Sequence, residues 1–179
     1  MQALIFLINT AFSLYLMVVL LRIWLQWARA DFYNPLSQFV VKATNPVVIP
    51  LRRLLPSIGK IDTASVLLAL VLVIAQSVCL RYLAFGQVFL PNLLVMALPM
   101  LVREALTLFF WVLIIRAIMS WFSQGNNPIE YLMHQLTEPV LRPVRRIIPP
   151  IAGLDLSVLV VIIALNVLNI LTLGWLPKF

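Results

Sequence analysis

The stretch from Asn34 to Asp62, NPLSQFVVKATNPVVIPLRRLLPSIGKID, decides the fold because the chain contains a second version of it. The second version runs from Asn127 to Asp155 as NPIEYLMHQLTEPVLRPVRRIIPPIAGLD, at a constant offset of 93 residues. Most positions that differ exchange one apolar residue for another, which indicates one supersecondary unit present twice. Eleven positions are identical: Asn34/Asn127, Pro35/Pro128, Thr44/Thr137, Pro46/Pro139, Val47/Val140, Pro50/Pro143, Arg52/Arg145, Arg53/Arg146, Pro56/Pro149, Ile58/Ile151 and Asp62/Asp155.

The composition of the chain is that of a membrane protein. Of its 179 residues, 63% are hydrophobic and 11% are charged, whereas a soluble domain has about 45–50% apolar and about 25% charged residues. The net charge is +7. Because the basic residues flank apolar segments, the charge indicates membrane orientation and contact with anionic lipid headgroups rather than nucleic acid.

Four apolar segments, over residues 3–25, 63–85, 105–122 and 156–176, are predicted to be membrane-spanning helices. The first, second and fourth have the roughly 20 residues that a hydrocarbon core requires. Residues 88–100 are apolar but interrupted by prolines, and we expect an interfacial or re-entrant connector there.

Between the spans, each copy of the repeat predicts a short amphipathic helix. Asn34 is a good N-cap and Pro35 suits the first helical position. Each helix is expected to end before a proline, at Pro46 and Pro139, because proline lacks a backbone N–H group. The proline-rich segments that follow are expected at the membrane surface. The apolar face is predicted from Leu36, Phe39, Val40 and Ala43 in the first copy, and from Ile129, Leu132, Met133 and Leu136 in the second.

The expected fold class is therefore an all-α membrane protein. Its four transmembrane helices form two tandem parallel hairpins, each with an amphipathic interfacial helix in its loop. The predicted organisation is a first repeat over 1–85, a connector over 86–102 and a second repeat over 103–179. Lysine and arginine excess marks the cytoplasmic side, so the repeated loops are expected in the cytoplasm and both termini in the periplasm. The loop side holds Arg29, Lys42, Arg52, Arg53, Lys60, Arg142, Arg145 and Arg146, and the opposite side Arg81, Arg103 and Lys178.

Charged residues at the loop ends of the spans are the first candidate site. Arg22 and Arg116 correspond in the two copies, and Asp62 and Asp155 open the second and fourth spans. One interpretation is an arginine pair that gates a polar path or binds lipid phosphate. A second interpretation is that each arginine is a cation favoured at the C-terminus of its helix, with a side chain that reaches the interface. A third is that the arginines form ion pairs with the aspartates.

The loop arginines and the amides within the spans are the other candidates. The pairs Arg52/Arg53 and Arg145/Arg146 are expected at lipid headgroups, with binding of a protein partner as the alternative. Four amides, Asn9, Gln76, Asn166 and Asn169, are expected either to bridge helices or to line an intramembrane polar path.

Residue patterns for catalysis or cofactor binding are not found in the sequence. His134 is the only histidine and has no neighbouring cysteine or histidine, so we expect no metal site. Neither a nucleophile–base arrangement nor a phosphate-binding glycine loop is present, and we expect neither a cofactor nor enzyme activity.

The repeated pattern Asn-Pro…Pro…Pro-x-Arg-Arg-x-x-Pro…Asp resembles the signature of the YggT/YlmG family of membrane proteins. The family motif corresponds to Arg22, Pro50, Arg52, Arg53, Pro56 and Asp62, and to Arg116, Pro143, Arg145, Arg146, Pro149 and Asp155. The resemblance implies a small bacterial inner-membrane protein with two copies of the family's domain and no catalytic residue. It also implies a link to osmotic-shock tolerance and to potassium or salt transport, or, in other members, to cell division, nucleoid distribution or cytochrome assembly.

Two functions follow as hypotheses. The first is an ion- or osmolyte-linked protein that acts as a homo-oligomer, with a path between subunits lined by the four amides and by Arg22 and Arg116. The second is a scaffold whose basic amphipathic loops organise lipids or recruit a membrane-protein partner.

Overall fold

The computed structural model describes residues 2–55, 57, 61–88, 90–122, 127–148 and 156–175. All the regular elements in these ranges are α-helices, so the predicted all-helical class is confirmed. There are six of them: α1 (Gln2–Trp27), α2 (Pro35–Leu54), α3 (Thr63–Phe85), α4 (Leu90–Phe122), α5 (Pro128–Ile147) and α6 (Leu156–Trp175).

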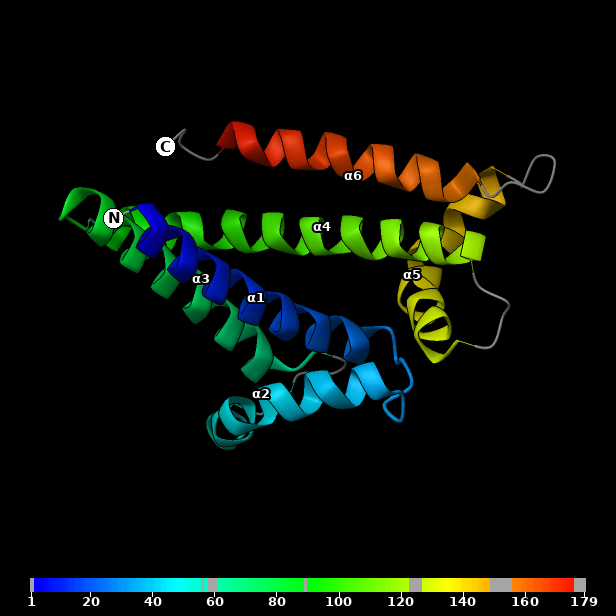
Figure 1. Cartoon of the computed structure of the whole chain (residues 1–179), viewed down its shortest axis with the longest axis horizontal. Coiled ribbons are helices and arrows are strands. Elements are labelled where there is room, and N and C mark those ends of the chain that lie inside the picture. Colours follow the sequence, from blue (N-terminus) through cyan, green and yellow to red (C-terminus); the bar gives the residue numbers. More distant parts are fainter. Residues whose placement is uncertain are drawn as a thin grey trace.

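The long helices lie in two pairs. In Figure 1, α1 lies beside α3, and α4 beside α6. The start of α1 and the end of α6 lie toward the left of this view, while α2 and α5 lie across the opposite ends of the long helices. The two copies of the repeated loop therefore meet at one end of the molecule.

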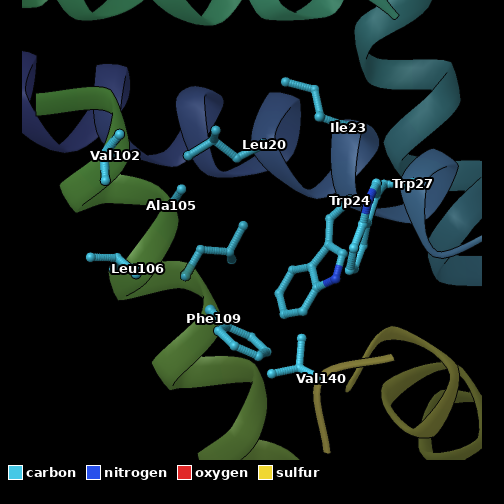
Figure 2. A pocket seen from close by; sticks show the side chains of 10 residues that line it. Leu20, Ile23, Trp24, Trp27, Val102, Ala105, Leu106, Phe109 and Val140 are labelled. Atoms are coloured by element: carbon cyan, nitrogen blue, oxygen red, sulfur yellow. The ribbon is translucent and has the colours of Figure 1, made fainter. Parts of the chain in front are cut away.

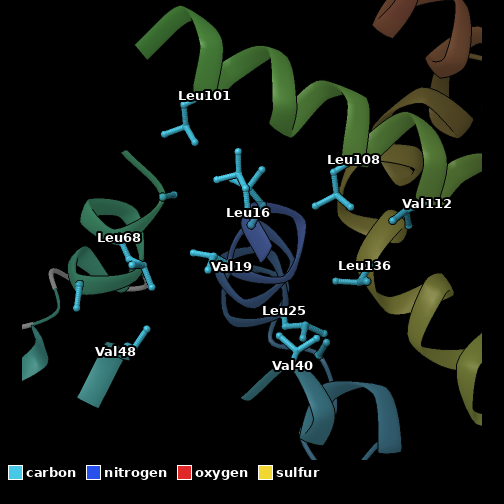
Figure 3. Close-up of a cluster of buried hydrophobic side chains, with 14 of the residues drawn as sticks. Leu16, Val19, Leu25, Val40, Val48, Leu68, Leu101, Leu108, Val112 and Leu136 are labelled. Carbon is cyan, nitrogen blue, oxygen red and sulfur yellow. The ribbon is translucent and has the colours of Figure 1, made fainter. Parts of the chain in front are cut away.

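The core joins helices from both copies of the repeat. Leu16, Val19 and Leu25 of α1 lie at its centre, each no more than 1% exposed (Figure 3). Around them pack apolar side chains of α2 to α5, including Val40, Leu68, Leu101, Leu108 and Leu136. A second, smaller cluster joins α4, α5 and α6 through Leu113, Leu141, Val161 and Leu165.

Helices α2 and α5 are longer than the sequence pattern predicted. Each is a 20-residue helix that continues through two prolines, Pro46 and Pro50 in α2 and Pro139 and Pro143 in α5. The prediction that they end before the first proline is wrong. All four prolines lie on exposed faces. The carbonyls that lose a backbone N–H donor to these prolines therefore point away from the core. Packing of the opposite, buried faces keeps the helices in place.

The buried face of α2 also differs from the prediction. Ser37, Val40, Thr44 and Val48 pack inward, each no more than 1% exposed, whereas Phe39 is 60% exposed. The structure places Phe39 outside because the polar residues Ser37 and Thr44 belong to the face that meets α1 and α3. For α5 the predicted buried face agrees better with the observed one. Of its four predicted residues, Leu132, Met133 and Leu136 are buried and only Ile129 is exposed.

Helix α4 replaces the predicted connector and third span by one continuous element of 33 residues. Pro91 lies in its first turn, where an N–H group has no helical partner in any case, and Pro99 removes a single hydrogen bond. The expected interruption before residue 105 is therefore wrong. At 1.5 Å per residue the helix is about 50 Å long, longer than a hydrocarbon core of about 30 Å.

Three of the described helices are long and apolar enough to cross a membrane: α1, α3 and the part of α4 from Leu90 to Met119. Helix α6 contributes a shorter apolar stretch, Leu156–Thr172. Large apolar side chains such as Phe6, Val95 and Ile170 are exposed along these helices, as expected for helices whose solvent is lipid.

Candidate functional site

The first arginine cluster (Arg22, Arg52 and Asp62) lies where α1, α2 and α3 meet. Asp62 is 1% exposed and accepts two hydrogen bonds from Arg52 Nε, at 3.2 Å to Oδ1 and 3.1 Å to Oδ2, and one from Arg52 Nη2 at 2.6 Å. Ser65 Oγ donates to the same carboxylate at 2.7 Å. Arg22 Nε lies 3.8 Å from Asp62 Oδ2. The structure thus brings together the arginine of the first span and the aspartate that opens the second.

Arg22 also binds α2 directly. The side chain is 5% exposed, and Nη1 donates to Thr44 Oγ1 at 2.5 Å and to Asn45 Oδ1 at 2.9 Å. Thr44 Oγ1 in turn donates to Val40 O, one helical turn earlier. The guanidinium is therefore directed into the protein, where it fastens the amphipathic helix to α1, and is not extended toward lipid headgroups.

The second arginine cluster (Arg116, Glu138 and Arg145) is the counterpart in α4 and α5. Arg116 Nη1 donates to Thr137 Oγ1, the equivalent of Thr44, and Arg116 Nη2 lies 3.9 Å from Glu138 Oε2. Arg145 Nη1 donates to both carboxylate oxygens of Glu138, at 3.2 and 3.0 Å. His134 Nε2 lies 3.5 Å from the same carboxylate. Asp155, one of the two aspartates that one interpretation paired with the arginines, lies outside the described residues.

The electrostatics of the first cluster favour an ionised carboxylate. Burial alone would raise the pKa of the Asp62 carboxyl, but hydrogen bonds from Arg52 and Ser65 and the charges of Arg52 and Arg22 together lower it. The hydrogen bond to Asp62 raises the pKa of Arg52 in return. An aspartate held ionised between two permanently charged guanidiniums serves as a fixed link between helices.

The N-caps behave as predicted at the two Asn-Pro sites. Asn34 Oδ1 accepts from Leu36 N at 3.0 Å, and Asn127 Oδ1 accepts from Ile129 N at 2.9 Å. Asp62 differs: it occupies the N-cap position of α3, but its carboxylate makes no capping hydrogen bond to the backbone. The reason is that Arg52 and Ser65 occupy its oxygens.

Hydrogen bonds join the two copies near these caps. Asn34 Nδ2 donates to Pro128 O at 2.6 Å, so the start of α2 is tied to the start of α5. Trp24 Nε1 donates to Leu136 O at 3.1 Å, and its ring meets Phe109 edge to face at 4.8 Å. The loop ends of the two copies therefore form one connected structure.

The four loop arginines divide into two kinds. Arg52 and Arg145 turn toward the carboxylates of the clusters, whereas Arg53 and Arg146 are exposed. Of the residues expected at lipid headgroups, the second arginine of each pair is the one whose side chain faces away from the protein.

The four intramembrane amides fall into two separate places. Gln76 Nε2 donates to Asn9 Oδ1 at 2.8 Å and to Ser13 Oγ at 3.1 Å, which links α3 to α1. Asn166 and Asn169 lie on α6, away from the first pair. Among the described residues, Asn169 Oδ1 is buried without a hydrogen-bond partner, and Asn166 is exposed on the surface of the chain.

An apolar crevice of about 370 Å³ lies between the two copies. Figure 2 shows Phe109 of α4 beside Trp24 of α1, with Val102 and Leu20 farther along the crevice. Val140 of α5 lies at one end. Among the described residues that line the crevice, only the tryptophans carry a polar group.

Sequence reasoning missed the partners of the arginines on the amphipathic helices. Thr44 and Thr137, which bind the arginines, are each fully buried. The sequence did mark these two threonines, because they form one of the eleven identical pairs of the repeat. Glu138 replaces Asn45 at the same place in the repeat. The repeat therefore gave no signal that Glu138 forms ion pairs with Arg116 and Arg145. Among the described residues, no three His, Cys, Asp or Glu side chains gather as a metal-binding group.

Taken together, membrane-length helices and buried arginine clusters that fasten amphipathic helices define the class: a duplicated, helical, membrane-type protein. The chain belongs to the CCB3/YggT family, whose model matches residues 1–83 and again 95–176, so that each match contains one copy of the repeated loop.

Its relatives are bacterial. A Vibrio alginolyticus protein from the region 3′ of proC is 59% identical over 96% of this chain and 94% of its own length. The YggT protein of Escherichia coli strain K12 is 48% identical over 94% of this chain and 88% of its own length. A Pseudomonas aeruginosa protein is 42% identical over 96% and 89%, respectively. No solved structure matches the chain.

Proposed function

We propose that the chain is a non-enzymatic protein of the bacterial inner membrane that crosses the bilayer four times. In this proposal α1, α3, α4 and α6 are the spans, arranged as two tandem hairpins, and α2 and α5 are interfacial helices. The bacterial relatives, the apolar helices and the joint position of α2 and α5 at one end of the molecule support it.

The orientation follows from the distribution of basic residues. Arg53 and Arg146 are exposed at the ends of α2 and α5, and a lysine and arginine excess favours the cytoplasmic side. We therefore place α2 and α5 on the cytoplasmic leaflet and both chain ends in the periplasm.

For the biological role, the geometry best supports a scaffold on the cytoplasmic leaflet that organises anionic lipids or a partner protein. The observation that carries this proposal is the equivalent fastening of the two amphipathic helices, by Arg22 to Thr44 and by Arg116 to Thr137. Two helices held in this way, with Arg53 and Arg146 turned outward, present a basic surface of defined shape to headgroups.

A second candidate is an ion or osmolyte path that underlies osmotic-stress tolerance and potassium homeostasis. The resemblance to the YggT/YlmG family favours it, and so does Asn166, an amide on the outer surface of α6. Since the described core of a single chain is filled by leucine and valine side chains, such a path would have to form between subunits of an oligomer.

Two measurements on purified protein in liposomes separate the candidates. Potassium flux that is lost on Arg116→Ala and Asn166→Leu would support the path, and sealed vesicles with folded protein would contradict it.

For the scaffold, an Arg53→Gln/Arg146→Gln variant is expected to retain anionic lipid less well, by about 1 kcal/mol per arginine. The matched control is Arg103→Gln, an exposed arginine of α4 far from both interfacial helices in sequence. Equal lipid retention in all three proteins would contradict the scaffold.

A further inference from the structure

Helix α6 carries an exposed stripe with the spacing of a helix–helix contact. Leu159, Ile163, Asn166 and Ile170 follow one another at intervals of four, three and four residues, and all four are exposed. Alternating steps of three and four residues keep side chains on one side of a helix and form the seam along which two helices pack. The opposite side of α6 already packs on α4 and α5 through Val161 and Leu165.

Asn166 is out of place on this stripe if only lipid covers it. It is ten residues from Leu156, so it lies about 15 Å along α6, near the middle of a hydrocarbon core of about 30 Å. Its Nδ2 donates to Ile162 O at 3.0 Å within the helix, and among the described residues none donates to its Oδ1. A polar group exposed to hydrocarbon is costly unless it finds a partner, and amides in membranes commonly find one on a neighbouring helix.

We propose that a second copy of this chain covers the stripe, forming a parallel α6–α6 pair about a two-fold axis along the membrane normal. Copies inserted in the same orientation hold equivalent residues at the same depth, so the two-fold axis brings Asn166 against the partner's Asn166. Each amide then supplies a donor or acceptor to the other. A single asparagine within an apolar seam also sets the register and the number of helices. The proposal rests on the four-span arrangement above and not on transport.

The first test is disulfide cross-linking in native membranes, in a Cys79→Ala background. Ile163→Cys and Ile170→Cys are expected to form a dimer of twice the chain mass on oxidation. Leu168→Cys is the matched control, because Leu168 is exposed at a similar depth on a different side of α6. Cross-linking of the stripe variants no better than the control, or only to a protein of another mass, would overturn the proposal.

The second test is the dimer affinity in vesicles, measured by energy transfer between labelled copies. Asn166→Leu is expected to weaken association roughly 5- to 30-fold, the effect of losing an interhelical hydrogen bond, and Asn166→Gln is expected to retain most of it. Unchanged association of the leucine variant would contradict the amide contact. Failure of the proposed orientation is recognised separately, by the accessibility of Lys42→Cys on α2, and lack of potassium flux leaves this inference unaffected.

Discussion

At the scale of single residues, Asp62 is the group on which the first copy depends. Its carboxylate joins Arg52 of α2, Arg22 of α1 and Ser65 of α3. Two of these partners are guanidinium cations, and the carboxylate is buried. Removal of the charge would leave Arg22 buried beside a neutral group, and unpaired buried charges are costly.

Asp62→Asn is accordingly expected to destabilise the protein by about 2–4 kcal/mol, somewhat less than a fully buried pair because Arg52 is 43% exposed and can turn to water. The measurement is reversible unfolding in detergent or bicelles. Asp31→Asn is the control, since Asp31 accepts one backbone hydrogen bond, from Tyr33 N, in the loop after α1. Equal stability of the two variants would refute the central role of Asp62.

The same carboxylate predicts how stability depends on pH. The folded state lowers the pKa of Asp62, so the unfolded chain binds its proton more readily, and the ionised form stabilises the fold. This contribution is fully present above the unfolded pKa of about 3.9 and is lost as the pH falls below it toward the folded pKa. Melting temperatures recorded from pH 6 to pH 3 should fall more steeply for the natural protein than for Asp62→Asn. Parallel curves would contradict the assignment.

At the scale of elements, α2 and α5 show how tertiary contacts outweigh local propensity. Proline within a helix costs about 3 kcal/mol, and two of them predicted that each helix ends early. Both helices continue because Thr44 and Val48, and correspondingly Thr137 and Leu141, are buried on the far side from the prolines. Packing and the arginine contacts offset the lost hydrogen bonds.

The two Asn-Pro caps offer a matched pair of substitutions at this scale. Asn127→Ala removes a single capping hydrogen bond at an exposed position and is expected to cost about 1 kcal/mol. Asn34→Ala removes the same bond and also the bond from Nδ2 to Pro128 O, for a total of about 2 kcal/mol. Unfolding measurements on both variants test the difference. A larger effect at Asn127 would show that the contact between α2 and α5 contributes nothing.

At the scale of the whole molecule, the two copies share the contact that fastens each amphipathic helix to a span. Arg22 binds Thr44 in the first copy, and Arg116 binds the equivalent Thr137 in the second. Acids pair with the same arginines: Asp62 with Arg22 and Arg52, and Glu138 with Arg116 and Arg145. The repeated arginine-to-threonine contact indicates that the fastening of α2 and α5 is a shared feature of the two copies.

The position of both interfacial helices on one side of the membrane gives the last prediction. In a Cys79→Ala background, Lys42→Cys on the exposed face of α2 should be inaccessible to a membrane-impermeant maleimide in intact cells and should react after lysis. Gln2→Cys, at the opposite end of α1, should react in intact cells and serves as the control. The reverse pattern would invert the proposed orientation, and reaction of both would contradict it.

Much of the fold could be predicted from the sequence, because the signals are local. The Asn-Pro caps and the apolar segments of α1 and α3 each depend on residues a few positions apart, and the repeat is found by comparing two stretches of sequence. The predicted helix limits were wrong at Pro46 and Pro99, and the predicted buried face was wrong at Phe39. At these positions the local rule did not take account of contacts with distant parts of the chain.

The sequence by itself determined that the chain is a duplicated helical protein of membrane composition, and which arginines and aspartates are candidates for pairing. Only the tertiary structure decided that Arg22 reaches Thr44 and Asp62, that Glu138 lies beside Arg116, and that Asn166 faces outward. The physical reason is that helix caps and apolar runs are set by neighbouring residues. The partner of a long charged side chain, in contrast, depends on which helices pack together and at what depth.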